Sequence, residues 1–110
     1  MKVEQKGHTT IIRNTHGSTS EFYQKLHHEY NSFKSQNIII DLSSDKALTM
    51  DDIKLFGDLI KIHNTAKKSL VIVADSVNFN AVPKNITLVP TILEAHDIIE
   101  MEEIERDLGF

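Results

Sequence analysis

Acidic and hydroxyl side chains gather in one short stretch of the sequence, DLSSDKALTMDD, which spans residues 41–52. Carboxylates can act as general acids and bases, and a turn before a helix can hold a phosphate group. This turn has no glycine to let a phosphate approach the backbone, and Asp45 would repel an anion. Asp51 and Asp52 follow Thr49 in the first turn of a predicted helix, where capping and the helix dipole favour acidic residues without catalysis. We therefore predict no enzymatic activity, and nucleotide or small-ligand binding at this turn is an alternative.

Other catalytic and metal-binding patterns are missing from the sequence. Ser43 and Ser44 lack the glycines of a strained nucleophile elbow, and there is no cysteine. No two histidines have the i, i+4 spacing of a helical zinc site, and the adjacent His27 and His28 would point about 100° apart on a helix. We predict surface histidines, no metal site and no cofactor. The six histidines are His8, His16, His27, His28, His63 and His96.

Length and composition indicate one globular domain that covers residues 1–110, with 40% hydrophobic and 25% charged residues. The first residues do not resemble a signal peptide and no segment has the apolar length of a membrane span, so we expect a cytoplasmic protein without membrane contact. Residues 91–110 hold seven acidic residues and one arginine, which gives this segment a net charge of −6. The whole chain has a net charge of −4, so the excess of acidic residues lies at this end. This acidic end argues against direct nucleic-acid binding, and we interpret it as a solvated helix face rather than a partner surface.

Hydrophobic periodicity predicts strands and helices in alternation. A hairpin that turns near Gly7 comes first, and buried-type strands follow at residues 37–42, 69–75 and 86–90. Helices should start at Ser18, Thr49 and Thr91, each of which has an acidic residue three positions later. The last helix should stop at Gly109, with Phe110 folded back on its final turn. This order predicts an α/β fold with a small, mixed and mostly parallel sheet.

The helix that starts at Thr49 should continue without a break through one apolar stripe. Its members are Ile53, Phe56, Leu59, Ile60 and Ile62. Gly57 lies inside this pattern, where glycine is costly relative to alanine, and we expect the helix backbone to lie close to the sheet there.

The order of elements, with NIIIDLSSDKALTMDDIKLFGDLI at its centre, resembles the STAS domain. That family includes anti-sigma-factor antagonists and the cytoplasmic domains of sulfate transporters. Its strand ends in D-L-S, which matches residues 41–43, and its D-S-S-G sequence falls on residues 49–52. The resemblance implies helices mainly on one side of the sheet and a protein partner, such as a regulatory kinase-like or anti-sigma-type protein. Met50 stands where the antagonists carry their phosphorylated serine, so Thr49 becomes the candidate phosphoacceptor, with Ser44 as a second.

The leading hypothesis is a non-enzymatic STAS-like domain that docks a partner through the loop and helix start from Ser43 to Ile53. The predicted partner-binding or regulatory residues are Asp41, Ser43, Ser44, Asp45, Thr49, Met50, Asp51 and Asp52.

The C-terminal sequence VPTILEAHDIIEMEEIERDLGF also resembles the ending of short STAS-like bacterial chains, some of which are called ribonuclease Z. That name implies a metallo-β-lactamase nuclease with an H-x-H-x-D-H zinc motif, which this sequence does not contain. The alternative that this resemblance suggests is an accessory role in tRNA 3′-end processing, or a name that does not fit the chain.

Overall fold

Five strands form one mixed sheet in the computed structural model, which describes residues 1–15 and 17–109. The strands lie side by side in chain order, with β1 antiparallel to β2 and all later pairs parallel. Their bounds are Lys2–Lys6 for β1, Thr9–Arg13 for β2, Asn37–Asp41 for β3, Leu70–Val73 for β4 and Leu88–Val89 for β5. The predicted α/β class and mostly parallel sheet are confirmed. The predictions for His16 and Phe110 concern residues outside those described.

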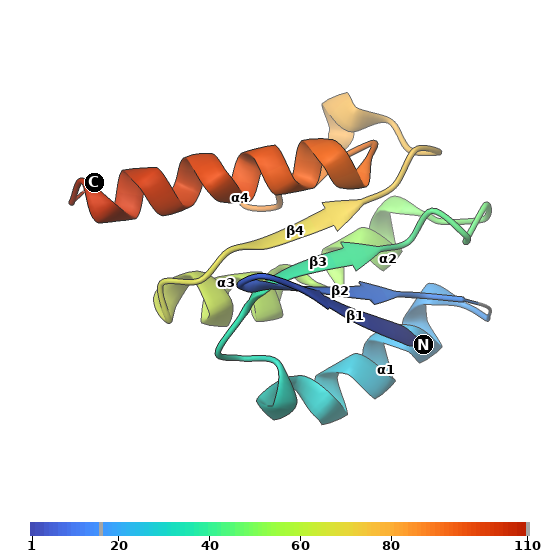
Figure 1. Cartoon of the computed structure of the whole chain (residues 1–110). Helices are drawn as coiled ribbons and strands as arrows, with labels where there is room; N and C mark the ends of the chain where they lie inside the picture. The colour runs from blue at the N-terminus through green and yellow to red at the C-terminus, as the bar shows by residue number, and fades with distance from the viewer. Residues whose placement is uncertain (16, 110) are drawn as a thin grey trace.

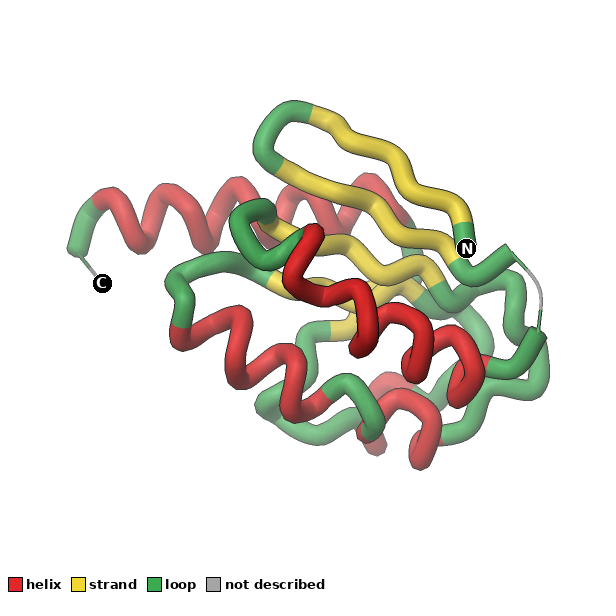
Figure 2. Tube along the Cα trace, turned by 90° about the horizontal axis from the view of Figure 1, so that it is seen from below, coloured by secondary structure: helices red, strands yellow, loops and turns green. Residues whose placement is uncertain are grey.

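The helices form a layer on each face of the sheet (Figure 1). Their bounds are Thr19–Glu29 for α1, Met50–Lys54 for α2, Gly57–Thr65 for α3 and Ile92–Asp107 for α4, with short 3-10 turns at Tyr30–Ser32 and Phe79–Ala81. Helices α1, α2 and α3 cover one face, and Figure 2 shows them in front of the strands. None of the helices within the described ranges has the length and apolar character needed to cross a membrane.

Helix α4 covers the opposite face, so the helices are not confined to one side of the sheet. Alternate residues of β3 separate the two layers: Ile38 and Ile40 belong to the core beneath α1–α3, whereas Ile39 packs with Ala95 and Ile99 of α4. Strands β3 and β4 are continuous apolar runs, and such strands are stable only when both faces are covered.

The prediction of one helix from Thr49 through Ile62 is wrong. The chain tightens between α2 and α3, where Leu55 N–H donates to the Asp52 carbonyl at 3.3 Å and Phe56 N–H donates to the Ile53 carbonyl at 3.2 Å. A 3-10 turn advances by about 120° per residue instead of about 100°, so it rotates the residues that follow. Ile62, which the prediction placed in the apolar stripe, is 52% exposed.

The helix backbone does not lie close to the sheet at Gly57, contrary to the expectation from the sequence. A Cβ atom there would meet only the side-chain nitrogen of Asn85, at 3.8 Å, which is ordinary contact. Gly57 is the first residue of α3 and does not have a positive φ.

Replacing Gly57 with alanine should therefore raise the free energy of unfolding by about 0.4–1 kcal/mol, because alanine reduces the entropy of the unfolded chain. Gly7 is the matched control: a Cβ there would meet no atom within 4 Å, but its φ is +62°. Gly7→Ala should destabilise by about 1–2 kcal/mol. Urea unfolding measures both, and changes of the same sign would contradict the assignment of these effects to the backbone.

Candidate partner-binding site at the carboxyl edge of the sheet

The loop from β3 to α2 lies at the carboxyl edge of the parallel strands, beside the loop that joins β2 to α1 (Figure 1). Asn14 N–H donates to the Asp41 carbonyl at 3.0 Å, which ties the ends of β2 and β3 together. This edge is where α/β sheets usually bind their ligands and partners. The eight residues predicted from the sequence all lie in this loop or at the end of β3 and the start of α2.

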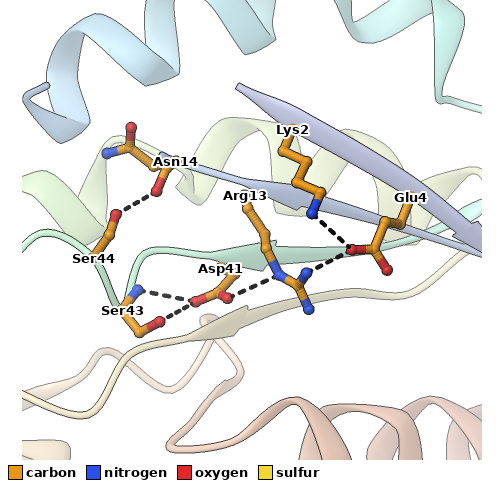
Figure 3. A network of polar contacts seen from close by, with 7 residues as sticks. All are labelled: Lys2, Glu4, Arg13, Asn14, Asp41, Ser43 and Ser44. Carbon is orange, nitrogen blue, oxygen red and sulfur yellow. Dashed lines mark hydrogen bonds and ion pairs between the residues drawn. The ribbon is translucent and has the colours of Figure 1, made fainter. Parts of the chain in front are cut away.

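Asp41 is the centre of a polar network at this edge (Figure 3). Its carboxylate accepts hydrogen bonds from the backbone N–H of Ser43 at 3.0 Å and from the Ser43 hydroxyl at 2.6 Å. The other carboxylate oxygen lies 3.3 Å from Arg13 Nε, since the two residues are partners in the β2–β3 register. Arg13 in turn pairs with Glu4 at 2.6 Å, and Lys2 lies 3.9 Å from the same Glu4 oxygen. The Ser43 hydroxyl is thus committed to holding the turn.

Ser44 and Asp45 fasten the loop to the β2–α1 segment. The Ser44 hydroxyl donates to the Asn14 carbonyl. One Asp45 oxygen accepts from the Thr19 hydroxyl at 2.6 Å and from the Thr19 backbone N–H at 3.3 Å, while the other accepts from Ala47 N–H at 3.0 Å. Asp45 therefore stabilises the first turn of α1 and the shape of its own loop.

Asp45→Ala should lower the free energy of unfolding by about 1–3 kcal/mol, because it leaves the hydroxyl of the buried Thr19 without its acceptor. Asp51→Ala is the control, since Asp51 is exposed and forms no ion pair with any described residue. It should change stability by less than about 0.5 kcal/mol. Thermal and urea unfolding compare the two, and equal losses would show that Asp45 has no structural role.

Thr49 and Asp52 form the predicted capping box at the start of α2. The Thr49 hydroxyl accepts from Asp52 N–H at 3.2 Å, and the Asp52 carboxylate accepts from Thr49 N–H at 3.0 Å. Met50 is half-buried against the core beneath α1–α3. Serine and threonine also cap the other two predicted helix starts, through Ser18 and Thr91.

The exposed part of the site is smaller than the predicted set and includes two residues that the sequence did not indicate. Lys46 is exposed and lies 3.5 Å from Asp75, which follows β4, and Ala47 beside it is also exposed. A lysine and an alanine in a polar turn carry no sequence signal of their own. The exposed residues between Ser43 and Ile53 are Ser44, Lys46, Ala47, Thr49 and Asp51.

The histidines do not all lie on the surface as predicted, because His63 is fully buried. Its Nε2 lies 2.7 Å from the Gln36 carbonyl oxygen, which can only accept, so Nε2 carries the hydrogen. Its Nδ1 then accepts from the Tyr30 hydroxyl at 2.7 Å. Burial lowers the pKa of His63, and the nearby charges of Lys68 and Arg106 lower it further, against an opposing contribution from the Gln36 hydrogen bond. The neutral ring joins α3 to the segment after α1.

Within residues 1–15 and 17–109, no group of three or more His, Cys, Asp or Glu side chains is arranged to hold a metal ion. No model of a known protein family matches the chain, and no curated protein is significantly similar to it.

Proposed function

We propose that this chain is a non-enzymatic, STAS-like interaction domain that docks a protein partner through the loop and helix start from Ser43 to Ile53. The observation that carries the proposal is that hydrogen bonds within the sheet edge and the loop hold the backbone of this segment in place. Asp41, Ser44 and Asp45 each bond to another part of the sheet edge or of the loop, which leaves neighbouring side chains exposed on a fixed backbone. A surface that is already ordered loses less conformational entropy on binding.

The side chains available to a partner are those that the internal network does not use. Lys46 and Asp51 offer opposite charges, and Ala47 between them in the chain offers a small apolar contact. Ser43 and Asp45 stabilise the loop that presents this surface, through their hydrogen bonds with Asp41 and Thr19. Complementary charges at such a surface govern partner choice and association rate.

Phosphorylation of Thr49 is not required by this proposal. The Thr49 hydroxyl already accepts a hydrogen bond as the helix cap, and a phosphate there would meet the carboxylates of Asp51 and Asp52. The loop can therefore present one constant surface instead of a switched one.

The test uses a partner captured from the native host and then purified. Ala47→Glu and Asp51→Lys change only exposed side chains, and each should weaken binding at least about tenfold, or 1.4 kcal/mol. Lys34→Glu, which alters an exposed residue outside the segment, should leave affinity unchanged. Isothermal titration calorimetry gives the dissociation constants. If both loop variants bind every purified partner as tightly as the unaltered chain does, this segment is not the docking surface.

A further inference from the structure

Helix α4 presents a second apolar surface that faces away from the sheet. Leu93, Met101, Ile104 and Leu108 are 72%, 57%, 59% and 67% exposed, respectively. At about 100° per residue these four side chains fall within a sector of roughly 80° on the helix, and the exposed Asp97 lies in the middle of the same sector. Scattered apolar residues on a surface are ordinary, but an aligned set on one helix face marks a contact surface. We call these four residues the α4 stripe.

The α4 stripe lies opposite the face that α4 buries. Ala95 and Ile99 pack on Ile39, Val71 and the neighbouring residues of the sheet, and about half a turn separates them from the stripe around the helix axis. Figure 1 shows α4 as the only labelled helix on its face of the sheet. The helix therefore has apolar residues on two opposite sides, and the fold uses one of them.

Helix α4 does not depend on the stripe for its attachment. The hydroxyl of Ser69, just before β4, donates to the Glu102 carboxylate at 2.5 Å and accepts from Arg106 at 3.1 Å. Thr91 caps the other end of the helix. Substitutions in the stripe should thus leave the fold intact.

Acidic side chains border the α4 stripe on both sides, and Asp97 lies within it. By helix geometry, Glu94 and Glu105 lie along one border, Glu100 and Asp107 lie along the other, and all four are exposed. Among the described residues, none of the four forms an ion pair. A second copy that packed its own stripe here would bring carboxylates against carboxylates, which is unfavourable. A partner with basic borders would instead pair with them.

We infer that the α4 stripe is a docking surface for a basic amphipathic helix, a partner segment with apolar residues on one face and lysine or arginine along the borders of that face. The apolar residues of such a helix would pack against the stripe, and its basic borders would meet Glu94, Glu100, Glu105 and Asp107. This surface is separate from the Ser43–Ile53 segment, because α2 and α4 lie on opposite faces of the sheet.

Two fluorescent synthetic helical peptides test the inference with the full chain. Both carry leucine along one face; one has lysine along the borders of that face, and the other has glutamate at the same positions. Fluorescence anisotropy should show binding of the lysine peptide, weakened by added salt, and no binding of the glutamate peptide. Equal binding of both peptides, or no binding of the lysine peptide, would overturn the inference.

Variants of the chain then locate the peptide. The double variant Leu93→Gln/Ile104→Gln keeps good helix formers and should weaken lysine-peptide binding about tenfold or more. Ile62→Gln, which alters an exposed apolar residue of α3, should have no effect, and neither should Asp51→Lys in the loop. Loss of peptide binding in Asp51→Lys would overturn the separation of the two surfaces. A different outcome is dimerisation, detected by sedimentation, of the unaltered chain but not of the double variant. That result would overturn the inference of a basic helix, because the stripe would then bind a second copy of the chain.

Discussion

Replacing Phe56 with alanine should remove about 3–5 kcal/mol from the free energy of unfolding. Phe56 is fully buried at the junction of α2 and α3, and its ring packs edge-on against Tyr23 of α1, with 5.1 Å between centroids and an interplanar angle of 86°. The substitution would open a cavity beneath all three helices of that layer. A small domain has only about 5–15 kcal/mol of stability in total, so much of it would be lost.

Leu55→Ala is the control for this effect, because Leu55 is the preceding residue and is 37% exposed. It should cost less than about 1.5 kcal/mol, since most of its contribution does not come from a closed cavity. Urea unfolding followed by circular dichroism gives both values. Similar losses in the two variants would show that the Phe56 ring is not the contact that joins α2 and α3 to α1.

Acidification should destabilise the fold through His63. The buried ring is neutral, with its two nitrogens bonded to Tyr30 and Gln36, and its pKa lies below the ordinary value of 6.5, chiefly because of burial. Protonation would place a charge in the core near the cations Lys68 and Arg106 and would require the Tyr30 hydroxyl to reverse its hydrogen bond. The folded state therefore takes up this proton less readily than the unfolded chain does.

The contribution of His63 to the free energy of unfolding should decrease as the pH falls below 6.5. Above pH 6.5 the histidine is neutral in both states, and its contribution to stability is complete. Below that pH the unfolded chain binds the proton first, so stability falls until the pH reaches the folded-state pKa. One group gives a slope of at most about 1.4 kcal/mol per pH unit.

Urea unfolding of the wild-type chain and of His63→Leu across this pH range measures the effect. The variant should be less stable at neutral pH, by about 1–3 kcal/mol, because Tyr30 and Gln36 lose their partner. It should also lose the slope below pH 6.5. His28→Leu, at an exposed position, should keep the wild-type slope. An unchanged slope in the His63 variant would assign the acid sensitivity to other groups.

The features that the sequence predicted correctly are those that depend on neighbours along the chain. The apolar runs at Ile38–Ile40 and Leu70–Val73 form central strands, and Ser18, Thr49 and Thr91 cap the helices that follow them. Buried strands and helix caps depend on residues that are close together in the sequence, so their positions can be predicted from the sequence alone.

The features that the sequence missed depend on single turns or on distant contacts. The chain makes one tight turn at Leu55 and Phe56 that divides the predicted helix into α2 and α3, and His63 is buried while Ile62 is exposed. Asp45 binds Thr19, which is 26 positions away in the chain, so no local pattern could show that its carboxylate supports another helix. The sequence predicted the candidate site only as a segment, and the division of its side chains into supporting and exposed ones required the fold.

The same sheet has consequences for aggregation. Its most apolar strands, β3 and β4, are the kind of segment that pairs readily with other chains, and both lie in the interior of the sheet. One outer edge is β1, fully exposed, with Lys2, Glu4 and Lys6 along it, and the other is β5, which is only two residues long and is followed by Pro90. Charged or very short edges of this kind resist the addition of further strands. Loss of β1 would uncover the edge of β2, so this polar strand protects the chain from self-association.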